Sequence, residues 1–120
     1  RIEVWIGHSC DVIPQLRRRF KEAGRQQLLP FAFVFMDHKG SKYHEDLHSL
    51  EEEGLLGVGS VILADNVLSP GAPLYLWRTT RPGAESGGYN TEIVQLREFA
   101  KSSDDWMSVT VYKGKPTRLK

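Results

Sequence analysis

The 120-residue sequence has one cysteine, almost no net charge and no long apolar run. The single Cys10 cannot form a disulfide within the chain, and the cysteine and histidines do not have zinc-site spacing. Sixteen Lys and Arg against fifteen Asp and Glu leave a formal charge of +1, too small for gripping a phosphate backbone. No stretch approaches the ~18 apolar residues of a spanning helix. We therefore expect no nucleic-acid partner and no membrane span, and these residues, which show no signal region, favour a cytoplasmic protein.

The composition is that of a folded domain, with 40% hydrophobic and 26% charged residues. A length of 120 residues suits a single core. The sequence begins at Arg1 rather than at a methionine and enters an apolar segment at once. We expect it to be part of a longer polypeptide.

Alternating and apolar segments predict an α/β fold with a mostly parallel sheet and a closing antiparallel hairpin. Residues 2–7 read as a strand, followed by a helix that Ser9 or Asp11 would cap and that has Pro14 in its first turn. The predicted later strands are 31–36 and 60–64, parallel and buried on both faces, and the hairpin of 91–99 with 106–113 around Ser102–Asp105. A crossover helix between the parallel strands would place Tyr43 and Leu47 in the core and Asp46 in water.

Polar residues follow the predicted strands at the edge where open α/β sheets bind ligands. Asp37-His38 follows one apolar run, Asp65-Asn66 follows the next, and the segment 7–11 follows the first strand. Carboxylate and amide oxygens are ligands for Mg²⁺ or Ca²⁺ rather than for zinc. Asp at a strand end also commonly caps the next turn or helix, so spacing alone leaves both interpretations open.

Longer sequence motifs are more specific to a protein family than the spacing of these polar residues. IGHSCDVIPQL at 6–16, FVFMDH at 33–38, EEEGLLGVGSVILADNVLSPGAP at 51–73 and VYKGKP at 111–116 closely resemble the catechol O-methyltransferase family. The resemblance covers nearly the whole chain. It implies the Rossmann-like sandwich of S-adenosylmethionine-dependent methyltransferases, with Mg²⁺ holding both oxygens of an aromatic diol.

The resemblance also implies roles for individual residues. By motif match the metal ligands are Asp37, Asp65 and Asn66; the cofactor-binding residues are Gly7, Ser9, Cys10, Asp37 and His38; and the substrate-binding residues are Asn66, Pro70 and Gln95. The family commonly has glutamine where Cys10 stands.

Two departures concern catalysis. The family's general-base lysine aligns with Gly40, which leaves Lys39 and Lys42 as candidate bases beside their interpretation as solvated side chains. The family's substrate-side glutamate aligns with Gln95, which can accept a hydrogen bond but carries no charge.

The family's glycine-rich cofactor loop and its ribose-binding acidic residue have no counterpart here. Residues 1–120 would therefore be a partial methyltransferase domain, from the third strand onward, and we expect no turnover from the chain alone. A second copy or the absent N-terminal half would complete the sheet, or the strand at 2–7 would pair directly with that at 31–36. Two interpretations remain: the parent is an Mg²⁺- and S-adenosylmethionine-dependent enzyme, or it is a non-catalytic structural or interaction subunit.

Overall fold

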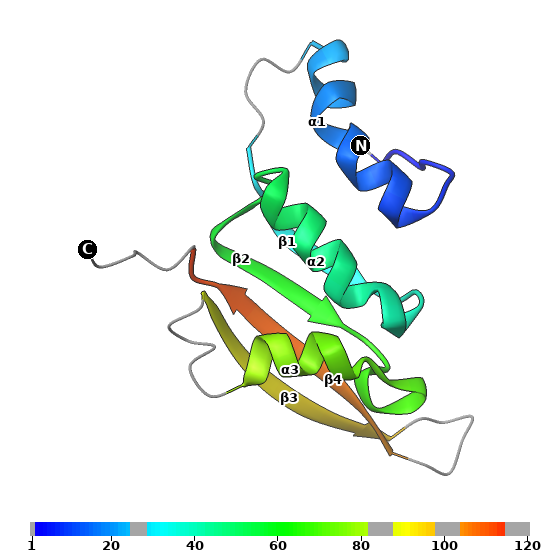
Figure 1. Cartoon of the computed structure of the whole chain (residues 1–120), viewed down its shortest axis with the longest axis vertical. Helices are drawn as coiled ribbons and strands as arrows, with labels where there is room; N and C mark the ends of the chain where they lie inside the picture. The colour runs from blue at the N-terminus through cyan, green and yellow to red at the C-terminus, as the bar shows by residue number, and fades with distance from the viewer. Residues whose placement is uncertain (1, 25–28, 82–87, 98–103, 115–120) are drawn as a thin grey trace.

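The computed structural model describes residues 2–24, 29–81, 88–97 and 104–114. They form a mixed α/β fold around one four-stranded sheet with the strand order β1-β2-β4-β3 (Figure 1). The elements in chain order are α1 (Ser9–Glu22), β1 (Phe31–Met36), the 3₁₀ turn η1 (Gly40–Lys42), α2 (Tyr43–Glu52), β2 (Leu56–Ala64), the irregular turn η2 (Val67–Gly71), α3 (Pro73–Thr80), β3 (Tyr89–Arg97) and β4 (Asp104–Tyr112).

The parallel pair and the hairpin are confirmed. Strand β1 has the predicted bounds, and β2 ends at Ala64 as predicted but begins earlier, at Leu56. The two strands run parallel, with Met36 opposite Ala64. Strands β3 and β4 are antiparallel, and β4 also pairs with β2. Part of the predicted connection at Ser102–Asp105 lies outside the described residues, and Asp104 and Asp105 begin β4.

Strand β1 is not buried on both faces, contrary to the prediction. Phe33 is 57% exposed and Phe35 is 50% exposed. The reason is position, because β1 stands at one end of the described sheet and pairs only with β2 there. Its apolar composition is that of a central strand, while its surroundings are those of an edge.

Residues 2–7 do not form the predicted strand. They have no strand assignment, and the apolar side chains of Ile2, Val4 and Ile6 are each at least 84% exposed. Direct pairing with β1, the alternative to completion by another chain, does not form in the described sheet. An alternating segment becomes a strand only where a neighbour takes its backbone hydrogen bonds.

Helix α1 begins differently from the prediction. Its N-cap is His8, which makes no side-chain capping bond, so neither Ser9 nor Asp11 caps the helix. Pro14 consequently lies in the second turn rather than the first. None of its side chains is fully buried. Phe20 packs against Phe31 of β1 with their ring centroids 6.3 Å apart.

Helices α2 and α3 lie across the same face of the sheet in Figure 1. In α2, Tyr43, Leu47 and Leu50 are buried as the apolar spacing predicts. Asp46 is also buried, at 2% exposure, which corrects its expected place in water. It shares the inner face because its position lies three residues after Tyr43 and four before Leu50.

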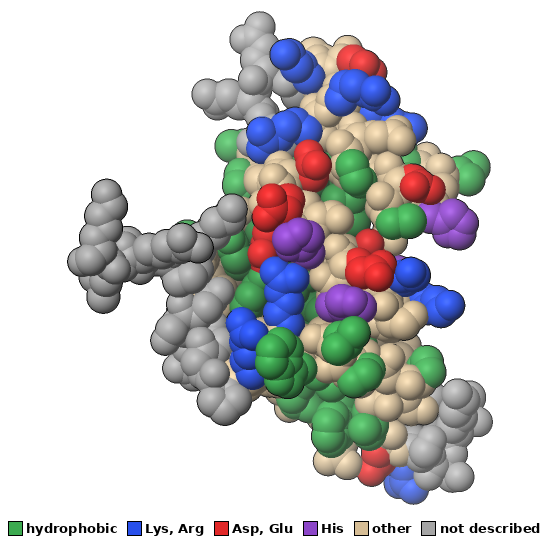
Figure 2. Space-filling view, in the orientation of Figure 1, with side chains coloured by type: hydrophobic (Ala, Val, Ile, Leu, Met, Phe, Trp, Pro, Cys, Tyr) green, Lys and Arg blue, Asp and Glu red, His purple; other side chains and the backbone are tan. Residues whose placement is uncertain are grey.

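The visible face mixes charges over α1 and α2, whereas hydrophobic side chains gather over α3 (Figure 2). Leu68, Leu74 and Trp77 are exposed in that region. Within the described ranges, the helices are all too short or too polar to cross a membrane.

Candidate functional site

The ends of β1 and β2 bring the first two predicted metal ligands side by side. Met36 and Ala64 are register partners, so Asp37 and Asp65 leave neighbouring strands at the same level. The backbone N–H of Asp65 donates to the Met36 carbonyl at 2.9 Å and continues the pairing by one bond. The two carboxylates therefore start about one strand spacing apart, roughly 4.8 Å.

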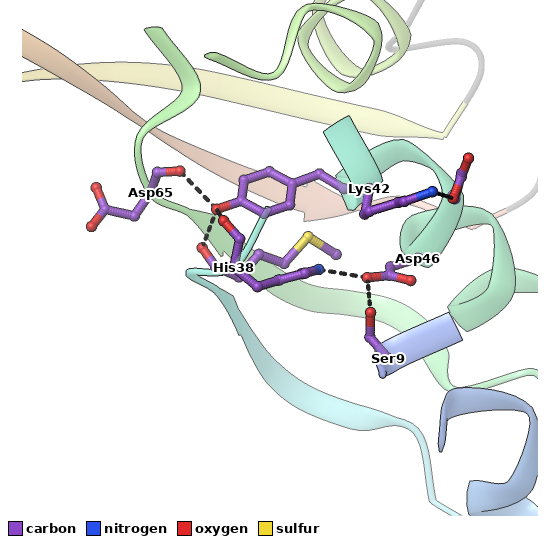
Figure 3. A network of polar contacts seen from close by, with 8 residues as sticks. Ser9, His38, Lys42, Asp46 and Asp65 are labelled. Atoms are coloured by element: carbon purple, nitrogen blue, oxygen red, sulfur yellow. Dashed lines mark hydrogen bonds and ion pairs between the residues drawn. The ribbon is translucent and has the colours of Figure 1, made fainter. Parts of the chain in front are cut away.

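The hydroxyl of Tyr43 connects the ends of the two strands through hydrogen bonds. Its hydroxyl lies 3.2 Å from the Met36 carbonyl oxygen, 3.3 Å from that of His38 and 3.0 Å from that of Asp65 (Figure 3). One phenolic proton is thus shared among three acceptors on two loops. Burial, together with the nearby carboxylates of Asp37 and Asp65, raises the pKa of Tyr43 to about 12.

Asn66 is oriented by Asp105 of β4. Its backbone is left-handed, with φ of 57°, and its backbone N–H donates to Asp65 Oδ1. Its side-chain Nδ2 donates to Asp105 Oδ2 at 2.9 Å. Asp105 Oδ1 also accepts backbone N–H bonds from Ser69 and Trp106. Although burial alone would raise the pKa of Asp105, the hydrogen bonds from Asn66 and from backbone N–H groups lower it.

The described residues contain no cluster of three or more His, Cys, Asp or Glu that could hold a metal. The predicted ligands contribute two carboxylates and one amide. Asp37, Asp65 and Asn66 nevertheless follow adjacent strand ends, and all three offer the oxygen donors that Mg²⁺ takes. In Figure 3 the carboxylate and the backbone carbonyl of Asp65 point in opposite directions, and the carbonyl is the one that accepts from Tyr43. The donor chemistry fits a hard cation.

A cavity of about 580 Å³ lies between the start of α1 and the loop after β1. Its lining includes four of the predicted cofactor residues: Gly7, Ser9, Cys10 and His38. Cys10 is an exposed free thiol in the first turn of α1. Gly7 has φ of +145°, and a Cβ there would press on Val12. The fifth, Asp37, follows β1 immediately before His38.

Behind this cavity the carboxylate of Asp46 contacts two of its lining residues. Ser9 Oγ donates to Asp46 Oδ2 at 2.6 Å, and His38 Nε2 lies 2.6 Å from the same oxygen (Figure 3).

The two candidate bases take different positions, although both line the cavity. Lys42 Nζ pairs with Glu45 at 3.3 Å, and in Figure 3 its side chain extends away from Asp65. Lys39 is the N-cap of η1. Gly40, which aligns with the family lysine, is buried, and a Cβ there would collide with the Gly71 carbonyl oxygen. A lysine at position 40 would not fit this arrangement of η1 and η2.

The predicted substrate residues lie on η2 and β3. Pro70 follows a cis peptide bond inside η2, a turn that Asp105 holds through the Ser69 N–H. Gln95 stands opposite Trp106 in the hairpin, and its Nε2 donates to Asp104 at 2.9 Å.

Three residues that hold the candidate site were absent from the predicted set: Tyr43, Asp46 and Asp105. Tyr43 was expected only in the core and Asp46 only in water. The spacing of 43, 46, 47 and 50 on one helical face was the available signal for Asp46. For Asp105 the sequence held no local signal, because its partner Asn66 lies 39 residues away.

Comparison with known proteins agrees with the resemblance. No family model matches the chain. Catechol O-methyltransferase of Sus scrofa is 34% identical over 114 residues, 95% of this chain and 56% of that protein. The Bos taurus catechol O-methyltransferase is 42% identical over 76 residues, 63% of this chain and 26% of that protein. The chain thus spans little more than half the length of the first of these relatives.

Solved structures show the same fold. A crystal structure described as a putative O-methyltransferase from Klebsiella pneumoniae superimposes with a TM-score of 0.71 at 12% identity, covering 95% of this chain and 50% of that one. The O-methyltransferase from Bacillus cereus, solved in complex with SAH, gives 0.68 at 20% identity over 94% of this chain and 51% of that one. The sequence matches and the fold together confirm the predicted resemblance: the chain is a relative of the catechol O-methyltransferases.

Proposed function

We propose that the chain carries the metal and substrate side of an Mg²⁺-dependent O-methyltransferase, which transfers a methyl group from S-adenosylmethionine to a hydroxyl of an aromatic diol. The main support is the adjacency of Asp37 and Asp65 at the ends of two paired strands, next to a cavity lined by Ser9, Cys10 and His38. Relatives named catechol O-methyltransferase support the substrate class.

Each set of residues has a part in this reaction. Asp37, Asp65 and Asn66 would hold Mg²⁺, which lowers the pKa of a bound hydroxyl. Gly7, Ser9, Cys10, Asp37 and His38 would bind S-adenosylmethionine, and Asn66, Pro70 and Gln95 the substrate. S-adenosylmethionine would supply the methyl group from its sulfonium sulfur to the substrate oxygen, whose proton would pass to a base or to water. S-adenosylhomocysteine and the methyl ether are the products.

Lys39 and Lys42 remain the candidate bases. Both line the cavity, and Lys42 would have to leave Glu45 to reach a substrate. Because Gln95 supplies no negative charge, we expect the second diol hydroxyl to be held less strongly than a glutamate would hold it.

The edge of β1 that has no partner in the described sheet suggests what completes the fold. Residues 1–120 would be the part of a methyltransferase domain from the third strand onward. Phe33 and Phe35 expose apolar surface on a strand paired only with β2 in the described sheet. A second copy or an N-terminal half of the same protein would supply the neighbouring strand. We still predict that the protein is cytoplasmic.

A non-catalytic subunit is the second candidate function. Gly40 favours it, because the position of the family's lysine has no room for a side chain. In that case the strand ends would keep their structural bonds without turning over substrate.

Methyl transfer to catechol by the complete protein separates the candidates. We expect turnover that requires Mg²⁺ and stops with a chelator. Asp65→Ala should lower it by at least about 100-fold, because a metal ion contributes several kcal/mol of charge stabilisation. Glu22→Ala, an exposed carboxylate on α1, is the matched control and should leave the rate unchanged.

Two outcomes contradict the proposal. Full Mg²⁺-dependent turnover in Asp65→Ala would remove the metal assignment. No methyl transfer by the wild-type complete protein, to catechol or to other aromatic diols, would favour the non-catalytic subunit.

A further inference from the structure

We propose that Asp46 is a positioning residue for the S-adenosyl ligand: its buried carboxylate fixes Ser9 and His38 on the cavity wall and acts on the ligand only through them. The inference rests on the proposed function, because it takes the 580 Å³ cavity to be the cofactor site.

The geometry joins three separate pieces of the chain at one oxygen atom. Ser9 is the first residue of α1, His38 lies in the loop after β1, and Asp46 belongs to α2. Both partners reach Asp46 Oδ2 at 2.6 Å, as Figure 3 shows.

Burying the carboxylate of Asp46 costs free energy, and core packing alone does not require a charged side chain at this position. Its residue is 2% exposed, and a carboxylate removed from water is costly unless it is paired and hydrogen-bonded. An apolar residue between Tyr43 and Leu50 would fill the same helix face without that cost. The carboxylate therefore calls for a reason beyond core packing.

The position of the three residues supplies the reason. Ser9 and His38 line the large cavity, whereas Asp46 is not among its lining residues. It lines instead a smaller hollow of about 340 Å³, together with Ser9, His38 and apolar side chains of α1 and β1. Asp46 thus stands behind the wall of the cofactor cavity and supports it.

The same bonds set the hydrogen-bonding pattern that the wall presents. A carboxylate only accepts, so His38 Nε2 must carry the hydrogen, and in the neutral ring Nδ1 is then an acceptor. Ser9 commits its hydroxyl proton to Asp46, which leaves its oxygen as an acceptor toward the cavity. Without Asp46 both groups would rotate, and a ligand would have to order them on binding.

In the complete protein, the test compares Asp46→Ala, Asp46→Asn and the control Glu52→Ala, an exposed carboxylate on the same helix. The probes are the affinity for S-adenosylhomocysteine by calorimetry, the KM for S-adenosylmethionine against kcat, and the ¹⁵N shifts of the His38 ring. We expect Asp46→Ala to weaken binding and raise KM about tenfold or more, the effect of losing a hydrogen bond to a charged group. At saturating cofactor, kcat should change far less.

Asp46→Asn keeps an accepting oxygen and should recover much of the affinity and the Nε2–H signature of His38. Glu52→Ala should match the wild type. Unaltered affinity and unaltered His38 shifts in a folded Asp46→Ala protein would overturn the proposal. So would an Asp46→Asn protein that binds as poorly as Asp46→Ala while its His38 shifts stay those of the wild type.

If Asp46→Ala does not fold, a double-mutant cycle of Asp46→Asn with Ser9→Ala decides the question. The effect of Asp46→Asn on affinity should shrink in the Ser9→Ala background, and an unchanged effect would contradict action through Ser9. A wild-type protein that binds no S-adenosylhomocysteine would defeat the proposed function instead. The His38 shifts would then still report whether Asp46 fixes the ring.

Discussion

At the scale of single residues, Tyr43 makes hydrogen bonds to both of the strand ends that form the candidate site. Its one hydroxyl lies within hydrogen-bond distance of three backbone carbonyls, those of Met36, His38 and Asp65. These carbonyls bracket both strand ends from which the predicted metal ligands leave. Losing the phenol would remove the O–H that faces all three carbonyls, although the Met36 carbonyl would keep the Asp65 N–H.

The raised pKa of Tyr43 gives this residue a signature in alkali. Its folded-state pKa of about 12 lies above the ordinary value of 10, so the fold favours the protonated phenol. Its stabilisation is fully present below pH 10 and is lost as the pH rises from 10 through 12. We expect the wild type to exceed Tyr43→Phe by about 1 kcal/mol at pH 8. This advantage should shrink at pH 11, as measured by urea unfolding of both proteins. A difference that stays constant across these pH values would contradict the assignment.

Asp46 and Tyr43 also show what a sequence reveals about a site residue. Helical spacing placed Tyr43 correctly in the core, since burial follows from periodicity. Asp46 has the same spacing, but its charged side chain favours an exposed position. Its partners, Ser9 and His38, lie 37 and 8 residues away, so a local pattern could not reveal the network.

At the scale of elements, the turns η1 and η2 meet at two glycines. Gly40 of η1 is buried against the Gly71 carbonyl, and the absence of a side chain permits that approach. A side chain at position 40, such as the lysine that the family resemblance implies there, would not fit this contact. The loop that follows β1 and the loop that follows β2 are thereby packed backbone to backbone.

Gly40→Ala tests this contact. A methyl group there must displace the backbone of η2, so we expect a loss of about 1–3 kcal/mol in unfolding free energy. Ser41→Ala, exposed in the same turn, is the control and should stay within about 0.5 kcal/mol of the wild type. Denaturant unfolding measures both. Equal stability of the two variants would show that η1 and η2 move apart without cost.

The strands divide into those that the sequence predicts well and one that it does not. Residues 31–36 and the hairpin form as expected because their neighbours, β2 and β4, lie within the described sheet. Residues 2–7 alternate but have no strand neighbour there, and Ile2, Val4 and Ile6 are exposed. Alternating apolar and polar residues indicate that a segment can form a strand, but the strand forms only where a second strand pairs with it.

At the scale of the whole molecule, the exposed apolar side chains of β1 and of residues 2–6 predict association. A solution containing only this 120-residue chain offers one partner, a second copy. We expect static light scattering at micromolar concentration to give about twice the monomer mass of 13.6 kDa. Phe33→Lys, which charges an already exposed position, should restore the monomer.

A wild-type chain that is monomeric and unfolds cooperatively would contradict this prediction. It would show that the chain tolerates the free edge of β1 by itself. Such a result would bear on assembly alone, since the strand ends that carry Asp37 and Asp65 are paired within the described sheet.

Helix α1 brings Ser9 and Cys10 to the cavity, yet it buries no side chain fully. The helix packs against the rest of the molecule through partly buried side chains such as Ile13 and Leu16, and through the hydrogen bond from Ser9 to Asp46. We expect a helix held in this way to detach at a free-energy cost below that of global unfolding. Any ligand that bridges Ser9 and His38 would therefore spend part of its binding energy on docking the helix. Ligand affinity and the local stability of α1 would then be coupled, because both depend on the equilibrium between the docked and the detached helix.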